Sequence, residues 1–418
     1  MDRRGGPRRS LTVGDVRRHR PDYGLVLICG LLVIIGLIII YAISPGLSRL
    51  HGNVGEDYYL MKQLMAIGLG IGAFSVTALM PLPYWKKIAP WLIVGAVASS
   101  LLLFIPMARF NDPVNGATRW LQLGPLSFQP AELVKFALLI NVSMFLTKQS
   151  ELGKINSWQE TIKPFGFILL GVAGLLMMAQ KDMGSTMVVA AMLLSMIYVA
   201  GIRARYLGGL AGSMLGAAIA ASIVMPHRIA RILTFLHPEA DAQGNGYHIS
   251  QALIAIGSGG VVGQGLGRSV QAFGYLPEAA NDSIFAVVAE KFGFIGSVML
   301  IALFGMLLFR IISIIERTPD MFARLVATGI MAWIFAHILI NIGAMLSLMP
   351  LKGITLPFIS YGGSSLLFTM AAVGLLLQIS RFTVPKARMA SFKGGSNEST
   401  RLGGRDRRPR YANASRYS

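Results

Sequence analysis

The sequence predicts an all-α polytopic membrane protein with about ten transmembrane helices, both termini in the cytoplasm, and a long external loop between spans seven and eight. Of the 418 residues, 54% are hydrophobic and only 14% are charged, whereas soluble domains carry about 25% charged residues. The mean hydropathy is +0.60, and the basic residues gather in the tails and in alternate connections. This composition excludes a soluble globular protein.

Ten segments are apolar enough to be spans, since a helix needs about 20 apolar residues to cross roughly 30 Å of hydrocarbon. Two of them are short, and the eighth contains Glu290 and Lys291 near its start. The ten segments are 23–44, 59–80, 87–106, 131–147, 163–180, 184–201, 206–225, 284–312, 324–348 and 363–380.

The distribution of Lys and Arg orients these spans. Seven Arg lie within the first 21 residues, and ten Lys or Arg lie from Arg381 onward. With both tails inside, every internal connection also carries at least two basic residues, which is the bias of cytoplasmic segments. We therefore predict basic cytoplasmic tails at 1–22 and 383–418, the second one disordered, around a membrane domain at 23–382. Because the positive charge flanks membrane spans, nucleic acid is excluded as a partner.

The predicted external loop, 226–283, is the longest connection between spans. Such a loop on a compact scaffold is usually functional or disordered, and the apolar run Leu253–Ile256 favours short interfacial helices over disorder. Its segment Gly257–Gly267 lacks the lysine and the strand–turn–helix context of a nucleotide loop. We therefore predict that these glycines permit tight turns.

Charged residues near membrane depth are costly, so each should face a cavity or a partner. Glu132 and Lys135 are spaced i, i+3 and either pair with each other or serve a site. Asp182 precedes a span, and we interpret it as a helix N-cap. The six His and the single Cys show no zinc-ligand spacing, so we interpret His337 as a packed or hydrogen-bonded core residue.

Asp282 lies at the end of the long loop, directly before the apolar run Ile284–Val288. Considered alone, it is best interpreted as the N-cap of span eight. The alternative is a general base, because partial desolvation at a water–lipid boundary raises the pKa of a carboxyl group toward the working range. Both interpretations stay open at this point.

The segment Pro350–Ser365, PLKGITLPFISYGGSS, has two prolines and three glycines between two spans. Irregular backbone at this depth is tolerated only when it is buried in protein or lines a wet cavity. We therefore predict a re-entrant turn at a site. Lys352 either binds an anionic phosphate there or extends its charge to the membrane interface.

Three motifs together resemble the signature blocks of the SEDS family, the peptidoglycan polymerases FtsW and RodA, in order and spacing. They are NGATRWLQLGPLSFQPAELVKF (Asn115–Phe136), GYLPEAANDSIFAVVAEKFGFIG (Gly274–Gly296) and the segment Pro350–Ser365. The third block, which contains Lys352, is more similar to the division proteins, FtsW, than to the elongation proteins, RodA. The resemblance extends over most of the chain, from the first span to the last.

The resemblance implies a glycosyltransferase that polymerises lipid II at the outer face of the cytoplasmic (inner) membrane. It would transfer a lipid-pyrophosphate-linked strand onto the 4-hydroxyl of lipid II. Asp282 matches the family's essential loop aspartate and would deprotonate this hydroxyl or help hold a divalent cation, Mg²⁺ or Mn²⁺; no organic cofactor is implied. The expected substrate-binding residues are Arg119, Glu132, Lys135, Lys352 and Ser360, with Arg228 and Arg231 as weaker candidates.

Four residues depart from the family pattern. Asn281, Ser283 and Lys291 stand where the family has Thr, Phe and Glu, and Ala131 stands where it has Ser. The first three flank Asp282 without replacing it. They therefore leave its expected role intact and change the surroundings of the pocket.

The resemblance also implies a place at the division septum. A class B penicillin-binding protein would supply transpeptidase activity there, and other divisome proteins would be further partners. Two other functions stay open: a lipid II flippase and a non-catalytic divisome scaffold. A flippase should carry charges along a path through the midplane of the membrane. Here the charges gather at the predicted external end, which favours the enzyme.

Overall fold

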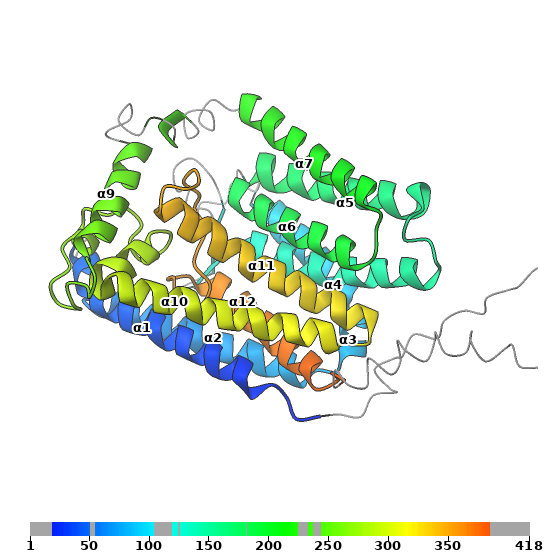
Figure 1. Cartoon of the computed structure of the whole chain (residues 1–418), viewed down its shortest axis with the longest axis horizontal. Helices are drawn as coiled ribbons and strands as arrows, with labels where there is room; N and C mark the ends of the chain where they lie inside the picture. Colours follow the sequence, from blue (N-terminus) through cyan, green and yellow to red (C-terminus); the bar gives the residue numbers. More distant parts are fainter. Residues whose placement is uncertain are drawn as a thin grey trace, which may run out of the picture.

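In the computed structural model of the chain, the described residues are 19–50, 55–103, 119–123, 126–180, 182–224, 233–235, 237 and 244–384. Ten helices of this part form one bundle, and successive helices alternate in direction (Figure 1). Each predicted span coincides with one of them, which confirms the predicted helical segments. The helices are α1 (Tyr23–Leu50), α2 (Tyr58–Leu79), α3 (Leu82–Leu102), α4 (Pro130–Glu151), α5 (Lys163–Gly174), α6 (Met183–Val199), α7 (Ala204–Val224), α10 (Ile284–Arg317), α11 (Met321–Met345) and α12 (Gly363–Ser380).

Both ends of the described chain lie at the same end of the bundle, which we call the terminal end. There the N–H of His19 donates to the carbonyl of Arg381 at 2.8 Å, and Asp22 lies 3.8 Å from Arg310. The opposite end, the loop end, carries the helix α9 (Asn245–Ser258), the short helix η5 (Gln271–Phe273) and the α11–α12 loop, residues 346–362 (Figure 1). The helix predicted in the long loop is therefore present.

Seven helices of the described part are long and apolar enough to cross a membrane: α1, α2, α4, the continuous helix Trp158–Met177, α10, α11 and α12. The helix α6 is apolar but shorter. Large apolar side chains are exposed on the outer faces, including Phe309 (71%), Met299 (67%) and Leu27 (65%). A surface of this kind is stable against hydrocarbon and not against water. The chain is a multi-pass membrane protein.

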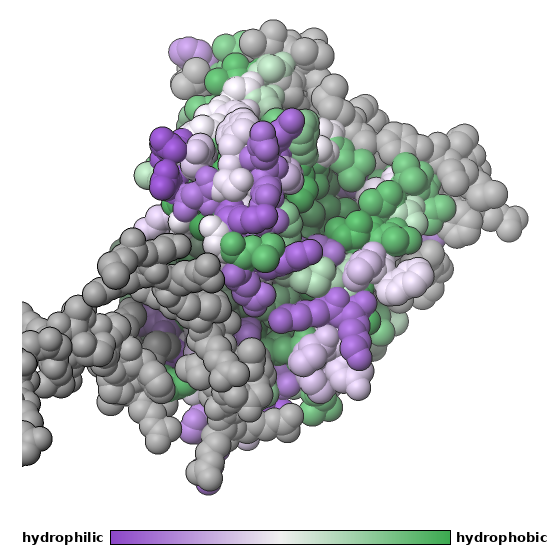
Figure 2. All heavy atoms as spheres, turned by 90° about the vertical axis from the view of Figure 1, so that its right-hand side faces the viewer, coloured by the Kyte–Doolittle hydropathy of each residue, from purple (hydrophilic) through white to green (hydrophobic). Residues whose placement is uncertain are grey.

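The two ends differ in charge. Figure 2 looks onto the terminal end, where hydrophilic side chains gather. Among the described residues, exposed Lys and Arg at the loop end are Arg49 and Arg268, whereas ten lie at the terminal end. These ten are Arg20, Lys86, Lys87, Lys148, Lys154, Lys163, Arg203, Arg205, Arg310 and Arg317.

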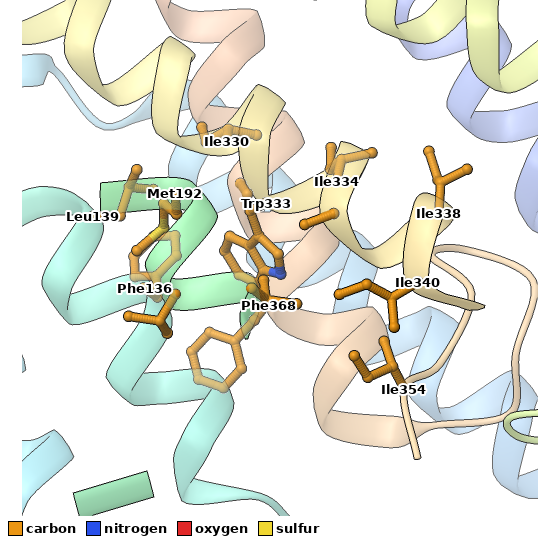
Figure 3. Packing of buried hydrophobic residues seen from close by; sticks show 14 of the residues in the cluster. Phe136, Leu139, Met192, Ile330, Trp333, Ile334, Ile338, Ile340, Ile354 and Phe368 are labelled. Carbon is orange, nitrogen blue, oxygen red and sulfur yellow. The ribbon is translucent and has the colours of Figure 1, made fainter. Parts of the chain in front are cut away.

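The helix α11 occupies the centre of the bundle. Its side chains Ile330, Trp333 and Ile334 pack among residues of α4, α6 and α12 (Figure 3). A Cβ on Gly329 would collide with the side chain of Leu139, so α4 and α11 approach closely. Polar residues on α11 are consequently held at fixed positions by a dense apolar core.

The structure adds two features that the sequence did not predict. Two short strands, β1 (Leu121–Leu123) and β2 (Leu126–Phe128), form an antiparallel pair before α4. The predicted eighth span is bent: Gly293 has φ 66° and ψ −162°, so α10 consists of two helical parts. Glycine is required at this point because the left-handed region is costly for other residues.

Candidate active site

The loop end places the carboxylate of Asp282 against the α11–α12 loop. Asp282 is half-buried and lies two residues before α10. A Cβ on Gly353 would lie 3.2 Å from its Oδ2 atom, so the carboxylate packs over a residue that has no side chain. Ser283 occupies the N-cap position of α10 and makes no capping hydrogen bond with its side chain. The interpretation of Asp282 as the helix cap is therefore wrong.

Hydrogen bonds join the Asp282 segment to the α11–α12 loop. The hydroxyl of Ser360 donates to the carbonyl of Asn281 at 2.7 Å and accepts from the N–H of Leu356 at 2.7 Å. The N–H of Tyr361 donates to the carbonyl of Ala280 at 2.8 Å. Ser360 is buried, and its hydroxyl serves the backbone in this arrangement. Its expected contact with substrate stays a prediction.

The α11–α12 loop holds unusual backbone conformations. Phe358 has φ +66° and, across the site, Glu278 has φ +50°. Such values cost about 1–3 kcal/mol in residues other than glycine and persist only where the surroundings fix them. Burial, with Tyr58 and Tyr59 nearby, raises the pKa of the Tyr361 hydroxyl. This phenol is therefore protonated at neutral pH and does not compete with Asp282 as a base.

Two of the predicted cations lie at the loop end. Lys352 directly precedes Gly353, is half-buried, and has its Nζ atom 3.1 Å from the sulfur of Met183 at the start of α6. Arg119 donates from Nε to the carbonyl of Gln180 at 3.1 Å. Both side chains come from segments outside the helices. Lys352 is thus the residue before the glycine that touches Asp282, and its ammonium group lies against Met183.

Asp182 lies between these segments as the N-cap of α6. Its carboxylate accepts from the N–H of Ser185 at 2.9 Å and from the hydroxyl of Ser185 at 2.7 Å. It also accepts from Nε2 of Gln129 at 3.2 Å. The prediction of a capping role for Asp182 is confirmed.

Glu132 and Lys135 form a buried ion pair at 2.7 Å, with 3% and 0% of their side chains exposed. Lys135 also lies 3.0 Å from Nε2 of His337 and 5.1 Å from the centre of the Trp333 ring. The predicted pairing is confirmed, and so is the interpretation of His337 as a hydrogen-bonded core residue. Because Lys135 is fully enclosed in this arrangement, its direct contact with substrate stays a prediction, as does that of Glu132.

Glu290 and Lys291 hold the loop that precedes Asp282. The carboxylate of Glu290 accepts from the N–H groups of Val270 and Gln271 at 2.7 and 3.0 Å. The ammonium group of Lys291 donates to the carbonyl of Leu266 and to the hydroxyl of Ser269, both at 2.9 Å. Each buried charge therefore has the protein partner that its depth requires.

The glycine segment of the long loop pairs with α10 through its backbone. The N–H groups of Gln264 and Gly265 donate to the carbonyls of Glu290 and Lys291 at 2.9 and 3.0 Å. Within the segment, Gly260, Gly263 and Gly265 have positive φ angles. The predicted tight turns are confirmed, and they bring this loop against the bend at Gly293.

One residue at the site was not predicted from the sequence, and the positions of two predicted residues cannot be compared with the structure. Asn341 of α11 donates from Nδ2 to the carbonyls of Asp282 and Ile354, at 2.8 and 2.7 Å. The signal that could have found it was a single amide inside an apolar span. Arg228 and Arg231 lie outside the described residues.

The match to a family model decides the relationship. The model for the cell cycle proteins FtsW, RodA and SpoVE matches residues 23–384, which include the whole described bundle from α1 to α12. The chain belongs to the FtsW/RodA/SpoVE family. The resemblance of its three motifs to the SEDS polymerases is thereby confirmed.

Members of the FtsW/RodA/SpoVE family match the chain over most of its length. The probable peptidoglycan glycosyltransferase FtsW of Thiomicrospira cyclica is 38% identical over 86% of this chain and 91% of its own. The stage V sporulation protein E of Bacillus subtilis is 35% identical over 88% of this chain and 99% of its own.

Solved structures agree with this family. A chain from a structure described as the structural coordination of polymerization and crosslinking by a peptidoglycan synthase complex has a TM-score of 0.69 at 27% identity. It covers 86% of this chain and 98% of its own. The rod shape determining protein RodA of Thermus thermophilus has a TM-score of 0.63 at 27% identity, and covers 88% of this chain and 98% of its own.

A divalent cation would fit the described part of this site together with ligands from the substrate. No group of three or more His, Cys, Asp or Glu side chains that could hold a metal ion occurs among the described residues. Magnesium is usually held by one or two carboxylates together with substrate phosphates and water. Asp282 offers one such carboxylate at the loop end, which is compatible with that kind of site.

Proposed function

We propose that this chain is a peptidoglycan glycosyltransferase that polymerises lipid II into glycan strands. The observation that carries the proposal is the half-buried carboxylate of Asp282, which packs 3.2 Å from the Cβ position of Gly353, the residue that follows Lys352 in the chain. A base and a cation at the same end of the bundle suit a transfer in which a hydroxyl loses a proton and a pyrophosphate departs. Relatives named as probable peptidoglycan glycosyltransferases support the same reaction.

In the proposed reaction, Asp282 is the catalytic base. Its carboxylate takes the proton of the acceptor 4-hydroxyl while that oxygen attacks the anomeric carbon of the lipid-linked strand. The bond between this carbon and the pyrophosphate oxygen breaks, and the lipid pyrophosphate leaves with the bonding electron pair. A single displacement of this kind inverts the anomeric centre. In the alternative role, Asp282 would help hold a divalent cation together with the phosphates, and that cation would add Lewis-acid stabilisation of the leaving group.

The leaving pyrophosphate needs positive charge as it develops. Lys352 is the first candidate, because it directly precedes the glycine against Asp282. Arg119 is the second, because it lies at the same end of the bundle beside the connection between α5 and α6. Lys135, Glu132 and Ser360 are proposed as further substrate-binding residues, and Arg228 and Arg231 are proposed as additional contacts from the long loop.

We place the loop end outside the cell and the terminal end in the cytoplasm, with all ten helices as spans. The ten exposed basic residues at the terminal end support this orientation, because cytoplasmic ends are enriched in Lys and Arg. The reaction then takes place at the outer face of the cytoplasmic membrane, where a lipid-linked substrate carries its sugars.

We also propose a transpeptidase of the class B penicillin-binding protein type as partner, and the division septum as the location. The match to a chain from a complex that couples polymerization and crosslinking supports a partner of this chemistry. The relatives named FtsW support the division role over the elongation role.

Polymerisation of lipid II by the purified full chain, with its partner and Mg²⁺ or Mn²⁺, tests the proposal. Asp282→Ala should lower the rate of glycan formation at least about 10²-fold, which is the scale of a lost general base. The matched control is Asp57→Ala, which removes an exposed carboxylate at the start of α2 that makes no capping hydrogen bond with its side chain. This control should polymerise normally.

The same assay separates the alternatives. Full polymerisation by Asp282→Ala would remove this residue from the mechanism. Movement of lipid II across vesicle membranes without any polymer would instead favour the flippase. If the chain gives neither activity and still recruits the partner, the scaffold is the correct function.

A further inference from the structure

Two polar side chains one helical turn apart on α11 face the α11–α12 loop. His337 and Asn341 are spaced i, i+4, which places them on the same face of the helix. They are buried, with 4% and 1% of each residue exposed. Figure 3 shows the loop residue Ile354 close to this part of α11. Buried polar groups are costly unless they are hydrogen-bonded, so the contacts of these two residues are informative.

Asn341 connects the two segments that make the candidate site. Its Nδ2 group donates to the carbonyl of Ile354 at 2.7 Å and to the carbonyl of Asp282 at 2.8 Å. A single amide nitrogen therefore fixes the backbone of the base relative to the backbone of the loop that carries Lys352. Because the amide comes from the central helix, neither segment can shift alone without breaking a buried hydrogen bond.

His337 attaches the next residue of the same loop. Its Nδ1 atom lies 3.0 Å from the carbonyl of Thr355, and its Nε2 atom lies 3.0 Å from the ammonium group of Lys135. A carbonyl only accepts and an ammonium group only donates. The imidazole is therefore neutral, with its proton on Nδ1 and its lone pair on Nε2. Through this ring, the ion pair of Lys135 with Glu132 is linked to the loop.

We propose that Asn341 and His337 are positioning residues that set the distance between Asp282 and the α11–α12 loop. They hold the consecutive carbonyls of Ile354 and Thr355, directly after Gly353, while Asn341 also holds Asp282. In this arrangement Lys135 acts on the site through His337. The catalytic consequence rests on the proposed function, whereas the geometric consequence does not.

A disulfide-trapping experiment tests the geometry without any turnover. In a Cys29→Ser background, Asp282→Cys and Gly353→Cys place one thiol on each segment at their point of contact, where the Gly353 Cβ position lies 3.2 Å from Oδ2 of Asp282. Disulfide formation requires Cβ atoms about 3.5–4.5 Å apart. The rate of cross-linking under a mild oxidant therefore measures whether the segments that carry positions 282 and 353 keep their relative position in the membrane.

The deciding variant is Asn341→Leu in this double-cysteine protein. We expect cross-linking to slow at least about fivefold, because the required geometry is narrow. The matched control is Asn141→Leu on α4, which also removes an amide that donates to two carbonyls, those of Ala89 and Ala137, at 2.8 and 2.9 Å. This control should cross-link at the parent rate. Equal rates in Asn341→Leu and the parent would overturn the proposal.

Two substitutions of His337 test its hydrogen bonds one at a time. They also test the proposal if Asn341→Leu does not fold. His337→Asn places an amide N–H near the Nδ1 position and should keep the bond to Thr355, whereas His337→Gln places its amide near the Nε2 position and should lose that bond. Cross-linking should therefore be retained in His337→Asn and slowed in His337→Gln. The reverse order, or no effect of either change, would contradict the role given to His337.

The catalytic consequence is measured separately with both natural residues, Asp282 and Gly353, in place. Asn341→Leu and His337→Gln should lower kcat about 10- to 100-fold, because small displacements at a reacting centre have effects of this size. KM for lipid II should change much less, since the proposed contacts do not touch substrate. If Asn341→Leu slows cross-linking but the natural chain makes no polymer, the proposed geometry is supported and the proposed function is rejected.

Discussion

Lys352 lies directly before the glycine against which the Asp282 carboxylate packs. If its charge stabilises the departing pyrophosphate, Lys352→Met should lower lipid II turnover by about 10²–10³-fold, the scale of a lost electrostatic contact to a transition state. Lys352→Arg should retain more activity than Lys352→Met. Folding should be unaffected, and gel filtration and thermal unfolding in detergent check this. Glycan polymerisation by the purified chain is the measurement.

The control for this residue is Lys87→Met. Lys87 is an exposed lysine near the start of α3, at the terminal end, where it lies 5.4 Å from the centre of the Tyr84 ring. It should polymerise lipid II at the parent rate. Unchanged turnover in Lys352→Met would return this side chain to the alternative role of a lysine that only reaches the membrane interface.

Single residues were predictable where a local pattern defines the partner. The spacing of Glu132 and Lys135 indicated their ion pair, and Asp182 before a span indicated its cap. By contrast, Asn341 is one amide in an apolar helix, and its partners at Asp282 and Ile354 are 59 and 13 positions away along the chain. Contacts over such separations depend on the packing of helices, which a local pattern does not contain.

At the scale of elements, α10 is bent at Gly293, where the loop segment around Gly263 packs against its backbone. A Cβ on Gly293 would collide with the backbone of Gly263, and φ is positive there. Gly293→Ala should therefore lower the melting temperature in detergent by several degrees, since a positive φ with ψ near 180° costs about 1–3 kcal/mol in a non-glycine residue. Lipid II polymerisation should fall with it, because this loop precedes Asp282.

The same helix offers a matched control. Gly305 lies in the second part of α10, and a Cβ there would have no neighbour within 4 Å. Gly305→Ala should leave the melting temperature equal or slightly raised, as alanine is favoured over glycine in a helix by roughly 0.5–1 kcal/mol. A similar loss of stability in both variants would show that the loss in Gly293→Ala does not come from the bend.

The helix α10 was predicted from the sequence, but its bend was not. Apolar length predicted that 284–312 is a helical span, and the helix is present as α10. The bend was not predicted, because it depends on backbone pairing between Gly260–Gly265 and the start of α10. The glycines themselves indicated tight turns only. The strand pair β1–β2 was likewise missed, since strands of three residues carry too short a pattern to recognise.

For the whole molecule, helix number and relative direction were predictable because each depends on a property that sums over many residues. Apolar length located ten segments, and the basic connections assigned them alternate directions. The structure agrees in that both described chain ends meet at the terminal end, where His19 bonds to Arg381. The packing of the other nine helices around α11 could not be predicted, because nearly every face of these helices is apolar and offers no single buried stripe.

The proposed orientation of the whole bundle predicts the labelling of single cysteines in intact cells. In a Cys29→Ser background, Tyr275→Cys lies at the exposed loop end and Glu151→Cys lies at the exposed C-terminal end of α4, at the terminal end. A membrane-impermeant thiol reagent should label the first in intact cells and the second only after permeabilisation, because ends rich in Lys and Arg stay in the cytoplasm. If Glu151→Cys were labelled from outside while Tyr275→Cys was protected, the bundle would be inverted, and Asp282 would face the cytoplasm, away from the sugars it is proposed to join.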